Sequence, residues 1–132
     1  MLDPWSFQPT VKQLRENLPT YYRLKKFSHP NRNDSELTDT IYQFSYHRSS
    51  FFVFKASGRE VFVGASLCDP CIVMRNGIHV GITRKEFFQC IPDLKPERMD
   101  TVRLISLRTM NGYNFIFKKD LLRCIKVDNR AK

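Results

Sequence analysis

The sequence predicts an α+β fold: two tandem helix–loop–three-strand units that form an antiparallel sheet with both helices packed on one face. Three observations support this class: an internal repeat, a helix-capping signature at the start of each repeat, and apolar alternation in the segments that follow. The chain of 132 residues suits one domain. We expect the first unit and a connecting strand in residues 1–77, and the second unit in 78–132.

The segments "TVKQLRENLP" (10–19) and "TRKEFFQCIP" (83–92) are the first matched pair. Each begins with threonine and has Gln or Glu three residues later, which is the capping-box signature of a helix N-terminus. Each then spaces apolar residues four apart and stops at a proline. The two segments therefore predict short, capped helices.

Three further pairs predict the strands: "DTIYQFSYHR" (39–48) with "DTVRLISLRT" (100–109), "FVFK" (52–55) with "FIFK" (115–118), and "REVFV" (59–63) with "RCIKV" (123–127). Alternation assigns one set of side chains to a shared face: Tyr42, Phe44, Tyr46, Phe52, Phe54, Val61, Val63, Arg103, Ile105, Leu107, Phe115, Phe117, Ile125 and Val127. The polar segment 24–38 is expected to be a loop. Asn-Gly pairs at 76–77 and 111–112 predict tight turns, the first of them after a "CIVM" strand (71–74).

The charge balance is basic, with 22 Lys and Arg against 13 Asp and Glu, a net charge of +9 and a pI near 9.7. This favours an anionic partner, whether nucleic acid, an acidic protein or a membrane surface. The charges are scattered, however, and the densest cluster is "RLKK" at 23–26, so a solvated surface also explains them. Apolar runs are far shorter than the ~20 residues of a membrane span. The start lacks signal-peptide features, so we expect a periplasmic or cell-envelope protein if a leader was removed, and otherwise a cytoplasmic one.

The four cysteines include a C-x-x-C pair, Cys68 and Cys71, which suits a redox couple or half of a zinc site. Because Cys90 and Cys124 are isolated, a second zinc pair is missing. A structural or incidental role is the favoured interpretation; a disulfide in an oxidising compartment is one form of it, and whether Cys68 and Cys71 form one stays open at this point. Cys90 falls near a helix C-terminus, where the dipole disfavours a thiolate, so we predict an unreactive thiol.

The sequence contains no recognisable catalytic motif. The three histidines belong to no known motif, and phosphate loops and nucleophile elbows are absent from the sequence. We therefore expect a non-enzymatic protein that needs no cofactor or metal and binds another protein through the outer sheet face. The expected partner-binding residues on that face are Gln43, His47, Lys55, Arg108, Lys118 and Lys126. The alternative is a basic nucleic-acid-binding module, although the phenylalanines of "FVFK" and "FIFK" are expected in the core.

A resemblance follows from "NGIHVGITRKEFFQCI" (76–91), the Tyr-x-Phe-x-Phe strand at 113–117 and the closing "LLRCIKV" (121–127). These segments are similar to the helix-plus-sheet module of the outer-membrane assembly lipoprotein BamE (small protein A) group. Tandem copies of such a module resemble the fold of β-lactamase inhibitor protein. The resemblance covers about Phe7 to Val127. It implies a non-catalytic protein of the bacterial cell envelope that binds other proteins, with no catalytic residues to carry over.

Overall fold

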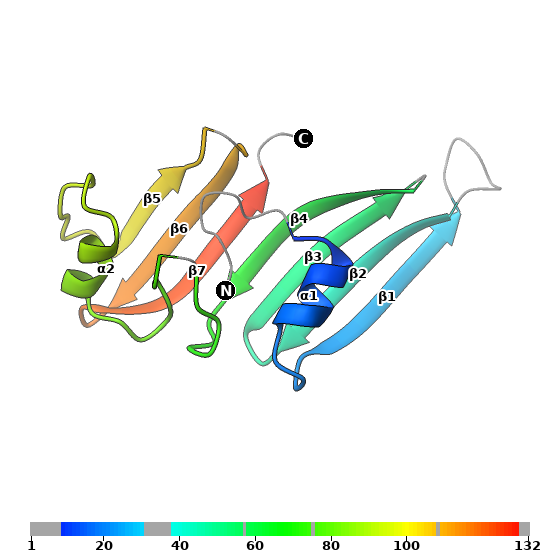
Figure 1. Cartoon of the computed structure of the whole chain (residues 1–132), viewed down its shortest axis with the longest axis horizontal. Helices are drawn as coiled ribbons and strands as arrows, with labels where there is room; N and C mark the ends of the chain where they lie inside the picture. The colour runs from blue at the N-terminus through cyan, green and yellow to red at the C-terminus, as the bar shows by residue number, and fades with distance from the viewer. Residues whose placement is uncertain (1–8, 31–37, 57, 75, 108, 130–132) are drawn as a thin grey trace.

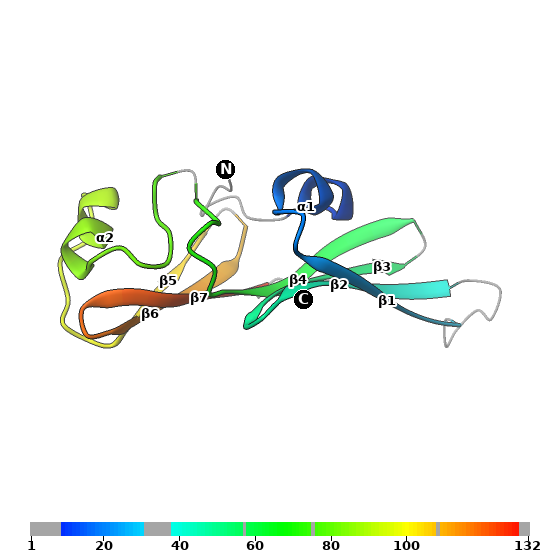
Figure 2. The same ribbon diagram turned by 90° about the horizontal axis from the view of Figure 1, so that it is seen from below.

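The computed structural model describes residues 9–30, 38–56, 58–74, 76–107 and 109–129. They form one seven-stranded antiparallel sheet of order β1-β2-β3-β4-β7-β6-β5, with two short helices on one face (Figures 1 and 2). The strands are β1 Arg23–Pro30, β2 Thr38–Tyr46, β3 Ser49–Ala56, β4 Arg59–Leu67, β5 Thr101–Ile105, β6 Asn111–Lys118 and β7 Leu121–Asn129.

The antiparallel sheet is confirmed, but the predicted α+β class of two helix–loop–three-strand units is wrong. The helices, α1 Val11–Asn17 and α2 Arg84–Cys90, have only seven residues each, so the described chain is closer to all-β. The first unit also has four strands, because much of the segment predicted as a loop, 24–38, forms the edge strand β1. The remainder of that segment, 31–37, lies outside the described residues.

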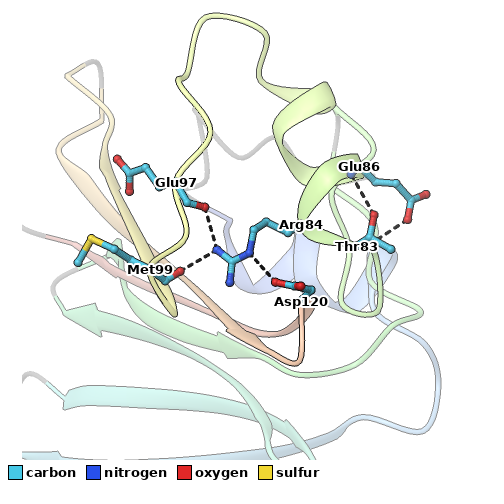
Figure 3. Close-up of polar contacts among 6 residues, drawn as sticks. All are labelled: Thr83, Arg84, Glu86, Glu97, Met99 and Asp120. Carbon is cyan, nitrogen blue, oxygen red and sulfur yellow. Dashed lines mark hydrogen bonds and ion pairs between the residues drawn. The ribbon is translucent and has the colours of Figure 1, made fainter.

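The two capped helices are confirmed. In α1 the Gln13 amide donates to Thr10 Oγ1 at 3.2 Å, and the Thr10 amide donates to Gln13 Oε1 at 3.0 Å. In α2 the same reciprocal pair joins Thr83 and Glu86, at 3.1 and 3.0 Å (Figure 3). Because these bonds satisfy two amide groups that a helix start leaves free, they explain how such short helices can begin where they do.

The core lies between the sheet and the helices and runs without a break across all seven strands. Directly paired residues place one apolar row on the helix-covered face: Leu24, Phe44, Phe51, Ala65, Val127, Tyr113 and Leu104. Leu14 of α1 and Phe87 of α2 are fully buried in the same apolar cluster. Both helices lie on the same side of the sheet, as Figure 2 shows, and therefore cover one continuous core.

Strand register explains why the predicted strand faces are partly wrong. Phe44 pairs with Phe51, which turns Phe52 and Phe54 to the other face, and the straight β5–β6 register does the same for Arg103 and Ile105. In β4 and in β7 a β-bulge also adds one residue, so alternation read along a straight strand changes face there. The predicted core residues that fall instead on the uncovered face are Phe52, Phe54, Val61, Arg103 and Ile105. Phe44, Phe115, Phe117, Ile125 and Val127 are buried as predicted.

One of the two predicted Asn-Gly turns is confirmed and the other is wrong. Asn76-Gly77 forms its turn, with the Gly77 amide donating to Met74 O at 2.9 Å, although only Met74 of the predicted "CIVM" strand makes a bridge. The Asn111-Gly112 prediction is wrong, because both residues belong to β6. The tight turn of the β6–β7 hairpin is Lys119-Asp120, whose φ angles of 54° and 60° suit a type I′ turn without an Asn-Gly pair.

Candidate functional site: a basic groove at the junction of the two halves

The site begins at the junction of β4 and β7, where the two halves of the sheet meet. Four register pairs join these strands, from Gly64↔Asp128 to Leu67↔Ile125. At the next position Cys68 and Cys124 face each other and form a disulfide, with Cα atoms 4.4 Å apart. Cys68 therefore pairs with Cys124 and not with its C-x-x-C neighbour Cys71, which is a free, exposed thiol. Sequence reasoning missed the pair because it depends on strand register between segments 56 residues apart.

A groove of about 960 Å³ lies beside this disulfide, at the ends of β4, β6 and β7 and next to the β2–β3 turn. Its lining includes five basic side chains: His47, Arg48, Lys118, Arg123 and Lys126. Among the described residues, none of the five makes an ion pair. Two carboxylates, Asp69 and Asp100, also line the groove, but the four Lys and Arg side chains outnumber them. An excess of cations raises the local concentration of anions, so the groove is suited to carboxylate or phosphate groups.

Three of the six predicted partner-binding residues, His47, Lys118 and Lys126, thus come together in the groove. Gln43 lies on the uncovered face, paired with Phe52 and away from them. Lys55 is on the helix side, in a depression beside α1. Arg108 lies outside the described residues.

Sequence reasoning missed Arg48 and Arg123 as members of the groove. Arg123 lies at the β-bulge between Leu122 and Cys124 in β7, a feature that has no local sequence signal. Arg48 follows His47 in the β2–β3 turn, so its position next to a predicted site residue was the available clue.

A buried carboxylate, Asp69, fixes one wall of the groove. Its Oδ2 accepts hydrogen bonds from the hydroxyls of Tyr21 at 2.8 Å and Tyr22 at 3.1 Å, and its Oδ1 accepts from the Cys71 amide at 2.9 Å. Hydrogen bonding to Cys71, followed by burial and Asp69, raises the pKa of Tyr21. Burial is the main cause that raises the pKa of Tyr22. Both hydroxyls therefore keep their protons at neutral pH and serve as donors.

This wall positions His47 at the rim of the groove. The Tyr46 ring lies 4.2 Å from the Tyr21 ring and 4.1 Å from the His47 ring, measured between centroids. His47 itself has a φ of 52°, in the left-handed region that histidine tolerates better than most residues. The sequence carried no signal for this cluster, because Tyr21 and Asp69 are 48 residues apart.

The uncovered face of the sheet continues from the groove. A polar row crosses all seven strands through directly paired residues: Arg23, Ser45, Ser50, Ser66, Lys126, Asn114 and Arg103. Four residues further along β1 to β3, and five along the bulged β4, lies an apolar patch centred on Phe27, Ile41, Phe54 and Val61. Neither described helix covers this face (Figure 2), and Phe27 is 53% exposed.

Arg84 of α2 fixes the segment that leads into β5. Its Nε lies 3.0 Å from Asp120 Oδ1, and its Nη1 donates to the carbonyl oxygens of Glu97 and Met99 at 3.0 and 2.7 Å (Figure 3). The guanidinium also lies 4.6 Å from the centroid of the Phe117 ring. One side chain therefore ties the start of α2 to the β6–β7 turn and to the chain before β5.

Chemically, the described residues offer binding groups more than reactive ones. They contain no group of three or more His, Cys, Asp or Glu side chains that could hold a metal ion. Burial and the nearby Glu86 raise the pKa of the Cys90 thiol, which lowers its thiolate fraction. This supports the expectation of an unreactive Cys90, while its reactivity itself stays a prediction.

Comparison with known proteins gave no match to a protein family, to a curated protein or to a solved structure. Within the part of the chain that the structure describes, neither helix has the length and apolar character to cross a membrane.

Proposed function

We propose that this is a non-enzymatic protein-binding or scaffold protein that docks the uncovered sheet face and the basic groove onto an acidic surface of another protein. One observation carries the proposal: a polar, basic row and an exposed apolar patch share one sheet face that no described helix covers. An apolar centre beside a polar rim is the usual arrangement of a protein–protein interface. Phe27 and Arg23 are side chains of the kind that anchor such interfaces.

The disulfide supports a place for this protein in the cell envelope. Disulfides persist mainly in oxidising compartments, and Cys68–Cys124 joins the two halves of the sheet. The resemblance of the second unit to the BamE group, and of the tandem arrangement to β-lactamase inhibitor protein, points in the same direction.

Cross-linking capture with the immobilised full chain tests the proposal. We expect a bound protein that is lost with Phe27→Asp and with Lys126→Glu, which change the uncovered face. Lys12→Glu is the matched control, because Lys12 is an exposed cation on α1, on the opposite side of the sheet. Capture that responds equally to all three substitutions, or that survives both changes on the uncovered face, would overturn the proposed docking surface.

A nucleic-acid-binding module is the second candidate, and one observation favours it. Phe52 and Phe54 were expected in the core, but they lie on the uncovered face near Lys25 and Phe27, where rings can stack with bases. This candidate predicts salt-dependent retention on heparin and on labelled single-stranded DNA, weakened by Phe27→Ala. Absence of binding at low salt would remove it.

A further inference from the structure

The two edges of the sheet differ in how they are protected. The first edge, β1, has the sequence "RLKKFSHP", in which Lys25, Lys26 and Pro30 are residues that discourage pairing with another strand. The second edge, β5, has the sequence "TVRLI", with Arg103 as its single charge and no proline. Its register with β6 runs straight from Thr101↔Ile116 to Ile105↔Gly112. Within the described chain, β5 is therefore the unprotected edge.

The backbone groups that β5 leaves free can be assigned. The Ser106 amide donates to Asn111 O at 2.9 Å, and the Phe117 amide donates to Asp100 O at 2.7 Å. Hydrogen-bonded pairs alternate in an antiparallel ladder, so Val102 and Leu104 also direct their backbone groups toward β6. The residues between them, Thr101, Arg103 and Ile105, direct their N–H and C=O groups away from the sheet.

Exposed apolar side chains gather around this edge. Among the described residues seven large apolar side chains are exposed, and four of them lie in β5 or within a few residues of it: Met99, Ile105, Leu107 and Met110. Leu107 is 89% exposed and Met99 66%. Arg84 holds the chain just before β5 through the carbonyl of Met99. The edge thus combines free backbone groups with apolar surface, which is what strand addition requires.

We propose that the β5 edge takes up an extended segment of a partner protein as an eighth strand, with an acidic residue opposite Arg103 and apolar residues next to Ile105 and Leu107. This rests on the proposed protein-binding function and names a site beyond the uncovered face. A second copy of this chain fits less well. Antiparallel self-pairing of all five β5 residues places Arg103 opposite Arg103, and each chain carries a net charge of +9.

Amide hydrogen exchange on the full-length protein tests the proposal, with a short capped, valine-rich peptide that carries a single central glutamate as the probe. The peptide is expected to slow exchange at Thr101, Arg103 and Ile105, the three amides that face away from β6. Val102 and Leu104, already bonded to β6, should change little. The matched control is the same peptide with lysine in place of glutamate, which should bind more weakly by about threefold to fivefold.

Two substitutions of Arg103 distinguish the contribution of its side-chain charge to peptide binding from the contribution of its backbone N–H. Arg103→Glu should reverse the preference and favour the lysine peptide. Arg103→Pro removes the outward N–H but leaves the amides of Val102 and Leu104 for β6, so the protein should fold and bind either peptide about tenfold more weakly. Lys25→Glu is the control for net charge, since it changes an exposed cation on the opposite edge. It should leave the peptide affinity within about twofold of the wild type.

Each contrary outcome is informative. Slower exchange only in strands other than β5, or equal loss with Arg103→Glu and Lys25→Glu, would overturn strand addition while leaving the proposed function standing. Absence of peptide binding would overturn it too, and cross-linking capture by the uncovered face would show whether protein binding survives. A concentration-dependent dimer that itself protects Thr101, Arg103 and Ile105 would assign the edge to a second copy and overturn the proposal.

Discussion

The two halves of the sheet repeat the same construction. Each begins with a capping-box helix, and each has a β-bulge at the same place, before Val53 in one half and before Phe117 in the other. Each helix start is also bonded to the turn region of a hairpin. The Val11 amide donates to Glu60 Oε1 at 3.3 Å, and the Arg84 amide donates to Asp120 O at 2.9 Å. These shared features come from local hydrogen bonding and the twist of paired strands.

The halves differ at their outer edges. The first half has the additional strand β1, which covers β2 and carries Lys and Pro residues. The second half ends at β5 (Figure 1) and has exposed apolar side chains there. A single additional strand, β1, thus protects the outer edge of the first half. The outer edge of the second half, β5, lacks such a strand and is the edge that we propose for a partner.

Core truncation should have the largest effect and tests whether both halves share one core. Phe87 is fully buried, with its ring 4.8 Å from Phe115 and 5.2 Å from Phe117, so Phe87→Ala should cost about 3–5 kcal/mol of unfolding free energy. The matching change in α1, Leu14→Ala, should cost about 2–5 kcal/mol. Urea unfolding measures both. A single transition is expected, and two separate transitions would contradict a shared core.

Loss of the disulfide comes next, because it joins the two halves. Cys68→Ser with Cys124→Ser should lower the unfolding free energy by about 2–4 kcal/mol, since the cross-link closes a long loop in the unfolded chain. Thermal and urea unfolding with and without reductant provide the measurement. Cys71→Ser with Cys90→Ser is the control and should leave the reductant effect intact. A wild type indifferent to reductant would contradict the assigned bond.

Arg84 distinguishes the second half from the first, where Val11 begins the helix. The Arg84 side chain is 15% exposed, and Arg84→Ala should cost about 2 kcal/mol by removing two carbonyl hydrogen bonds and the contact with Phe117. Arg84→Lys should recover part of this, because it keeps the charge but loses the planar fork. Lys85→Ala, at the exposed neighbouring residue, serves as the control. An equal loss for Lys85→Ala would contradict the specific role.

Low pH should destabilise α2 but not α1, and this is the smallest of the expected effects on stability. Hydrogen bonding from the Thr83 backbone lowers the pKa of Glu86 in the folded protein, whereas the equivalent Gln13 does not titrate. The stabilisation is therefore present above the ordinary glutamate pKa of about 4.3 and is lost as pH falls through the lower folded value. Amide exchange across this range should show α2 loosening before α1. Glu86→Gln should abolish the difference, and persistence of the difference in that variant would refute the cause.

Local features were the part that the sequence could predict. Both capping boxes depend on residues three apart, so Thr10 and Thr83 could be identified as helix starts without any tertiary information. The matched segments also indicated an antiparallel sheet. The class was wrong because a proline closes each helix within two turns, and because β1 looks polar when its partner is unknown. An edge strand needs less apolar surface than a central one, so β1 resembled a loop.

Features that depend on register could not be predicted. The β2–β3 register pairs Phe44 with Phe51 and so turns Phe52 and Phe54 to the uncovered face, because one residue of shift exchanges every side chain of a strand between core and solvent. The disulfide and the groove need β4 beside β7, a pairing with no signal in either strand alone. Lys126 and Lys118 were identified as surface cations, but their meeting with Arg48 and Arg123 follows from the strand order.

The central claim is that the second half presents an open edge, and residue-by-residue amide exchange in the free protein tests it most directly. The account predicts an alternating pattern in β5: slow exchange at Val102 and Leu104, and fast exchange at Thr101, Arg103 and Ile105. Uniformly slow exchange at all five amides would show that the edge is already paired and would contradict the claim.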